Sequence, residues 1–85
     1  MNWEKDTEAK FLQLLSKMPV FMRPMAEKAL RERAEKLAVK ENRGQINEKD
    51  MVDAFFMETP FGFQGMMKND LQAAGIDYTK YGHSK

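Results

Sequence analysis

Apolar residues recur at helical spacing along most of the chain. The first helix is expected to bury one face made of five residues: Trp3, Phe11, Leu12, Leu14 and Leu15. Similar stripes predict helices over residues 24–42 and 48–58 and a shorter one over 65–74, which Gly75 would end. No stretch alternates as a half-buried strand does. We therefore predict an all-α fold, an orthogonal three-helix bundle with a short fourth helix over residues 1–76, followed by a flexible tail over 77–85.

Prolines mark a corner between the first two helices. Pro19 disfavours helical geometry in the residue before it, and Pro24 suits the first position of the next helix. We interpret Pro19, Phe21, Arg23 and Pro24 as a structural corner. The Arg23 guanidinium is expected to bind carbonyl groups at the end of the first helix, or a carboxylate.

A short turn joins the second and third helices. Gly44 is placed where a helix needs a left-handed terminator. Asn47 is expected to cap the third helix, with Asp50 completing a capping box and Ile46 packing onto Met51 as a hydrophobic staple.

The composition excludes several classes of protein. The chain has 85 residues and no cysteine, which excludes disulfides, thiolate metal sites and thiol nucleophiles within it. A net charge of +1 creates no large field that would attract nucleic acid or an anionic membrane. No apolar run is long enough for a membrane span, and the first residues lack the pattern of a signal peptide. We expect a cytoplasmic protein that does not bind membranes.

No residues predict a reaction. His83 lies in the polar tail, where no partner is expected to fix its geometry. Asp50, Asp53 and Glu58 are spaced as helix caps and solvent-facing charges, although a cation held by them is the alternative. We predict no catalytic, cofactor-binding or metal-binding residue, and no enzymatic activity of the chain on its own.

A basic cluster on the second helix is the alternative that would predict nucleic-acid binding. Its members are Lys28, Arg31, Arg33, Lys36, Lys40 and Arg43. Interleaved glutamates cancel much of their field, which favours a solvated, ion-paired face. The third helix also carries Glu48, Asp50 and Asp53, which have the wrong sign for phosphates. Nucleic acid is therefore not the expected partner.

The most informative feature is a concentration of Phe and Met residues after the third helix begins. One interpretation is a core with a hydrophobic lid. The other is an exposed apolar patch that binds a protein partner, a second copy of the chain or a flat apolar ligand. The residues of this predicted patch are Phe55, Phe56, Phe61, Phe63, Met66 and Met67.

The chain resembles the small C-terminal domain of the B subunit of light-independent protochlorophyllide reductase. The matching positions are Trp3, Met18 to Arg23, Glu35 to Ala38, Gly44, and Ile46 with Asn47. It departs from that pattern by about one extra helical turn between Arg23 and Ala38, by Asn47 where the family has Thr, and after Glu58, where no counterpart can be placed.

The resemblance implies an all-α fold but transfers no catalytic residue, because the cluster-bearing part of that enzyme has no counterpart here. We therefore expect a non-enzymatic interaction module without a cofactor that docks on a protein partner, or self-associates, through the Phe/Met patch. The alternative that the resemblance implies is an accessory to tetrapyrrole reduction that binds the pigment or its oxidoreductase. A nucleic-acid-associated helical protein is the third and weakest alternative.

Overall fold

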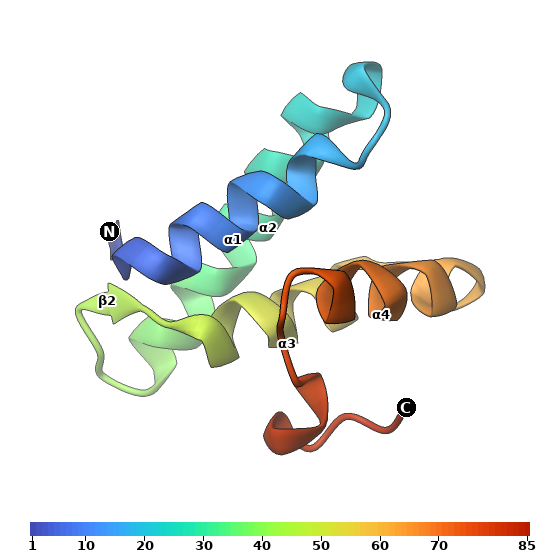
Figure 1. Cartoon of the computed structure of the whole chain (residues 1–85). Helices are drawn as coiled ribbons and strands as arrows, with labels where there is room; N and C mark the ends of the chain where they lie inside the picture. The colour runs from blue at the N-terminus through green and yellow to red at the C-terminus, as the bar shows by residue number, and fades with distance from the viewer.

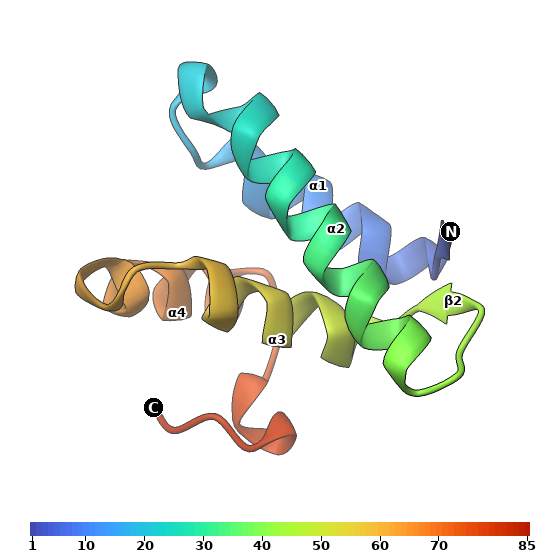
Figure 2. The ribbon, with the colours of Figure 1, turned by 180° about the vertical axis from the view of Figure 1, so that it is seen from behind.

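Two pairs of helices make up the computed structural model, which describes residues 1–85 (Figure 1). Helices α1 (Lys5–Ser16) and α2 (Arg23–Lys40) form the first pair, and α3 (Glu48–Glu58) and α4 (Gln64–Ala73) form the second. Within each pair the chain reverses direction through a 3-10 helix, η1 (Val20–Met22) or η2 (Phe61–Phe63). Helices α2 and α3 cross and make the most extensive contact between elements (Figure 2). The predicted all-α class is confirmed.

One hydrophobic core connects the two pairs. It draws side chains from all four helices and from residues on either side of them, so neither pair buries its apolar face alone. The buried cluster contains Phe11, Leu14, Leu15, Leu30, Ala34, Ala38, Ile46, Met51, Val52, Ala54, Phe55, Met67, Leu71, Ile76 and Tyr78. Three of these residues are alanines, two on α2 and one on α3, and small buried side chains let helices approach closely.

The first helix is shorter than predicted because Trp3 lies outside it. Strand β1 (Asn2–Trp3) pairs in parallel with β2 (Gln45–Ile46), and Trp3 lies opposite Ile46. The Glu4 amide then donates to the Ile46 carbonyl at 2.9 Å before α1 begins at Lys5. Two residues per strand are too few to show an alternating pattern, so this pairing could not be predicted from the sequence.

The end of α2 corrects the role predicted for Gly44. The left-handed residue is Asn42, with φ of 60°, and Gly44 has no positive φ. The amides of Asn42 and Arg43 donate back to the carbonyls of Val39 and Ala38, both at 2.9 Å, which is the Schellman arrangement. Asparagine tolerates this conformation better than other residues with a side chain, so the helix ends two residues earlier than expected.

The predicted caps of the last two long helices are confirmed. Asn47 accepts a hydrogen bond from the Asp50 amide, and Asp50 accepts one from the Asn47 amide, each at 3.0 Å. Ile46 and Met51 are both buried, as the staple requires. Gly75 has φ of 78° after α4, and Ile76 folds back with its amide on the Leu71 carbonyl.

The C-terminal residues differ from the expected flexible tail. The Tyr78 side chain is 2% exposed and belongs to the core, and it lies in a third 3-10 helix, η3 (Tyr78–Tyr81), that packs on α3. A large apolar ring stabilises the fold when it leaves water, which fixes this segment despite its polar neighbours. The folded unit therefore extends beyond residue 76.

Candidate functional site

One type of corner joins the helices of both pairs. Pro19 and Pro60 precede η1 and η2 with nearly the same backbone angles, φ/ψ of −54°/140° and −57°/146°. In each corner the proline carbonyl accepts from the amide three residues on, Met22 at 3.0 Å and Phe63 at 2.9 Å. In sequence the two corners share the proline, the methionine six residues after it and the chemical type of some positions between them.

A polar side chain fastens each corner to the preceding helix. Arg23 donates from Nε to the Met18 carbonyl at 3.0 Å and from Nη2 to the Ser16 carbonyl at 2.8 Å. The predicted role of Arg23 is thus confirmed, with carbonyls as its partners. Gln64 holds the same position after Pro60 and lies 3.4 Å from the Phe56 carbonyl through Nε2. These bonds satisfy carbonyls that a helix end leaves without partners.

Exposed apolar side chains gather at both corners. We call Val20, Phe21, Met22 and Met25 tip 1, and Met57, Phe61, Phe63 and Met66 tip 2; each of these side chains is about half exposed or more. Phe61 is 90% exposed and Phe21 is 84% exposed. Phe21 therefore does not pack within the corner, which corrects the structural role predicted for it. Pro24 lies at the second position of α2 rather than the first, since α2 begins at Arg23.

The predicted Phe/Met patch is divided between core and surface. Phe55 and Met67 are buried in the core, and Phe56 is half-buried against it. Only Phe61, Phe63 and Met66 are exposed. The predicted patch did not include Met57 or any residue of tip 1, although the sequence marked both as apolar. The signal that could have found tip 1 is the shared order of a proline, three residues, a polar residue and a methionine two further on, which both corners contain.

Both tips lie on one side of the molecule. In Figure 1 the corner of α1 and α2 lies at the top and the corner of α3 and α4 at the right, whereas β2 and the N-terminus lie at the left. The reverse view shows the same separation (Figure 2). Both corners therefore lie away from the end of the molecule that holds β2 and the N-terminus.

A buried acid organises the opposite end of α3. The Asp50 side chain is 1% exposed and binds both the Asn47 amide and the Arg43 guanidinium. Burial raises the pKa of Asp50, against the opposing effect of these two partners. This acid holds the start of α3 against the end of α2, which is a structural task.

Asp50→Ala is expected to lower the free energy of unfolding by about 2 kcal/mol, because it removes a helix cap and leaves the Asn47 amide without its acceptor. Urea denaturation followed by circular dichroism measures this change. Asp6→Ala is the matched control, since Asp6 is an exposed acid in the first turn of α1; we expect a change within about 0.5 kcal/mol. Equal losses in the two variants would contradict the structural role of Asp50.

Glu48 connects α3 to the first helix and to the C-terminal segment. Its carboxylate accepts from the Tyr81 hydroxyl at 2.6 Å and from Lys10 Nζ at 2.9 Å. Burial acts to raise the pKa of Glu48, but the bonds from Tyr81 and Lys10 outweigh it and leave this pKa below 4.5. Burial and the bond to Glu48 raise the pKa of Tyr81, so its hydroxyl stays a donor.

Glu48→Gln is expected to lower the free energy of unfolding by about 1 kcal/mol at neutral pH. Since the pKa of Glu48 is lower in the folded chain than its ordinary 4.5, its stabilising effect is complete above that value and is lost as the pH falls through the folded pKa. The stability gap between wild type and variant should therefore narrow in acid. Urea titrations at several pH values test this, with the exposed Glu32→Gln as control; a constant gap would contradict it.

His83 also has a fixed position, contrary to the sequence prediction. Its ring stacks on Phe56 with centroids 3.8 Å apart and planes at 2°, and its Nε2 lies 2.6 Å from Asp53 Oδ1. The contact joins residues 30 positions apart, so local sequence gave no signal for it. The Tyr78 ring also contacts Phe56, with centroids 5.6 Å apart.

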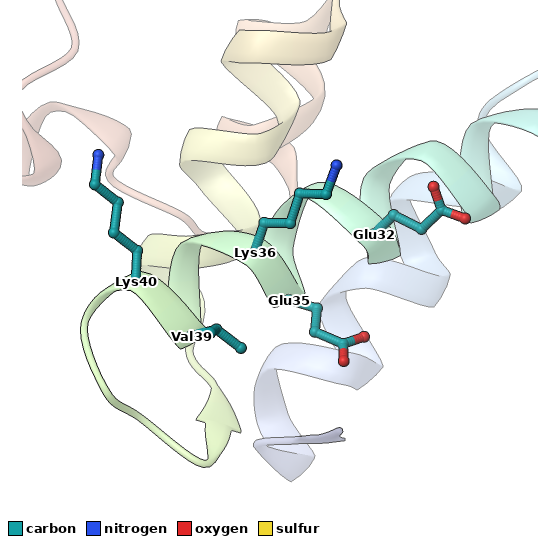
Figure 3. A pocket seen from close by; sticks show the side chains of 5 residues that line it. All are labelled: Glu32, Glu35, Lys36, Val39 and Lys40. Atoms are coloured by element: carbon teal, nitrogen blue, oxygen red, sulfur yellow. The ribbon is translucent and has the colours of Figure 1, made fainter.

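The acidic side chains and His83 do not gather into a metal site. No three His, Asp or Glu side chains converge as metal ligands would. A hollow on the outer face of α2 is lined by Glu32, Glu35, Lys36, Val39 and Lys40 (Figure 3). All five come from one helix, so no second element supplies groups that face them. No helix is long and apolar enough to cross a bilayer.

Comparison with known proteins places the whole fold in one family. A family model described as "Protein of unknown function (DUF2621)" matches residues 1–84. No curated protein and no solved structure matches the chain. The resemblance to the protochlorophyllide reductase domain therefore stays a prediction from the sequence. Because the match covers both helix pairs, both corners and the C-terminal segment, the chain belongs to the DUF2621 family.

Proposed function

We propose that this chain is a non-enzymatic interaction module that docks on a protein partner through its apolar tips. The observation that carries this proposal is the near-complete exposure of Phe61 and Phe21, each on a corner fixed by a proline and by a side-chain hydrogen bond. Fully exposed phenylalanines contribute little to folding, because their rings stay in water. Their presence at both corners therefore favours a role outside the fold.

The construction of the corners supports docking. An apolar surface can be covered by a partner at low cost only where the backbone beneath it already has hydrogen-bond partners. In each corner an amide is bound to the proline carbonyl, and the proline itself has no amide to satisfy. The tips are also held in place before binding, which reduces the entropy lost on association.

The same observations do not favour the tetrapyrrole-binding alternative. A ligand pocket is lined mainly by apolar side chains that converge from several elements. The hollow on α2 is lined by four charged side chains and one valine. A flat pigment would find exposed rings at the tips, whereas this hollow offers it a single apolar side chain.

Photo-crosslinking in extracts of the native host tests the proposal. A benzophenone amino acid at position 61 should give discrete adducts of higher mass, identified by mass spectrometry. The control carries the same group at position 39, because Val39 is another exposed apolar residue, on α2 outside the tips. Adducts no stronger at position 61 than at position 39 would contradict docking through tip 2.

A further inference from the structure

We infer that the partner that covers the tips is a second copy of this chain, which forms a two-fold dimer in which tip 1 of each copy packs on tip 2 of the other. This inference rests on the proposed function and names the occupant of the same surface. Three properties of the tips support it: their area, their charges and their common side.

The exposed apolar area is close to what a stable dimer needs. Phe21, Phe61 and Phe63 are 84%, 90% and 61% exposed, and because one aromatic side chain can bury ~150–250 Å², these rings alone offer roughly 350–600 Å² per copy. Four methionines and Val20 add a comparable share. A standard interface buries roughly 800 Å² per partner. The tips of one chain can therefore supply an interface of ordinary size.

The charges around the tips determine which tip meets which. Residues 16–28 carry three cations, Lys17, Arg23 and Lys28, against a single acid, Glu27, which already pairs with Arg31. Contact between two copies of tip 1 would bring these cations together, and like charges at an interface oppose association. Around tip 2, residues 57–69 carry one cation, Lys68, and one acid, Glu58, which already pairs with Arg33. Tip 1 therefore meets fewer cations on tip 2 than on another copy of tip 1, so pairing unlike tips reduces the repulsion.

The position of the tips allows this pairing to close. Both lie on the side of the fold away from β2 and the N-terminus (Figures 1 and 2). A two-fold axis that lies in the plane of contact, perpendicular to the line between the tips and opposite its midpoint, brings tip 1 of each copy against tip 2 of the other. Such an isologous contact uses both tips and ends at two chains, whereas a single contact between unlike tips would continue into a filament.

Sedimentation velocity of the full chain from micromolar to millimolar concentration tests the dimer. We expect a concentration-dependent species of twice the 9.9 kDa chain mass. Phe21→Ser and Phe61→Ser should each raise the dimer Kd by at least about tenfold, as interface anchors do. Val39→Ser, outside the tips, should leave it unchanged. A monomer at every concentration, or a dimer unaffected by both phenylalanine substitutions, would overturn the inference.

Disulfide trapping tests the pairing itself, because the natural chain has no cysteine. Val20→Cys and Gly62→Cys are purified separately, mixed and oxidised; a Cβ at Gly62 meets no atom within 4 Å, so that variant should fold. The mixed 20–62 disulfide should exceed its statistical share. An excess of 20–20 and 62–62 products would overturn the pairing of unlike tips.

The two proposals can fail separately. Adducts of dimer mass from position 61 would support both. A monomeric chain that still gives adducts of another mass would overturn the dimer and leave the docking function. A monomer that instead sediments with phosphatidylglycerol vesicles, and loses this with Phe61→Ser, would assign the tips to a membrane and overturn both.

Discussion

Tyr78→Ala is expected to lower the free energy of unfolding by about 3 kcal/mol, the effect of deleting a buried aromatic ring. Tyr78 lies outside the four long helices, but its side chain is 2% exposed and its ring centroid is 5.6 Å from that of Phe56. The ring thus connects the last segment of the chain to α3. Urea denaturation followed by circular dichroism measures the loss.

Two further variants separate the ring from the rest of the segment. Tyr78→Phe keeps the ring and should change stability by less than about 1 kcal/mol. Truncation after Ile76 removes the ring together with the contacts of Tyr81 and His83, and should destabilise at least as much as Tyr78→Ala. If Tyr78→Ala and the truncation both left stability unchanged, residues 77–85 would be the flexible tail that the sequence predicted.

The sequence predicted what depends on local pattern. Helical spacing of apolar residues located all four helices, and the Asn47–Asp50 capping box and Gly75 marked helix ends because each acts on neighbouring backbone groups. Asn42 was missed at the end of α2 because glycine is the commoner left-handed residue and Gly44 was nearby. Residue preferences favour Gly44 over Asn42 as the left-handed residue, but tertiary packing determines where the helix actually ends.

Contacts between distant residues could not be predicted in this way. The pairing of Trp3 with Ile46 and the stacking of His83 on Phe56 involve short segments with no periodic pattern. Their stabilisation comes from the surface that they cover once the helices have assembled. A sequence window at either end of such a contact holds no information about the other end.

The candidate site was predicted in part, for a related reason. Composition singled out the Phe and Met residues, but the same residue types fill cores and form interaction surfaces. Phe55 and Phe56 are adjacent in sequence, yet Phe55 is buried in the core and Phe56 only half-buried against it. Tip 1 was missed because Phe21 lies between Pro19 and Pro24 in a short corner and was interpreted as part of the structure of that corner. Only the three-dimensional course of the backbone shows whether such an apolar side chain is buried in the core or exposed at a tip.

Phe11→Ala is expected to have the largest effect of any single substitution described here, a loss of about 4 kcal/mol in the free energy of unfolding. Phe11 has no exposed surface, and its ring lies 4.6 Å from that of Trp3 and 6.2 Å from that of Phe55 between centroids. The Arg31 guanidinium lies 4.9 Å from the ring centroid. One ring thus contacts β1, α2 and α3 from its place on α1.

The adjacent residue provides the matched control. Leu12 lies on the same helix but is 52% exposed, so Leu12→Ala removes methyl groups that already contact water and should cost less than about 1 kcal/mol. Phe11→Leu should fall between the two, because leucine keeps the apolar volume but loses the ring contacts. Urea denaturation measures these free energies of unfolding. Equal losses for Phe11→Ala and Leu12→Ala would contradict a special role of the Phe11 ring in attaching α1 to the core. We expect the largest loss for Phe11→Ala, a smaller one for Phe11→Leu and the smallest for Leu12→Ala, because only the Phe11 ring contacts both helix pairs.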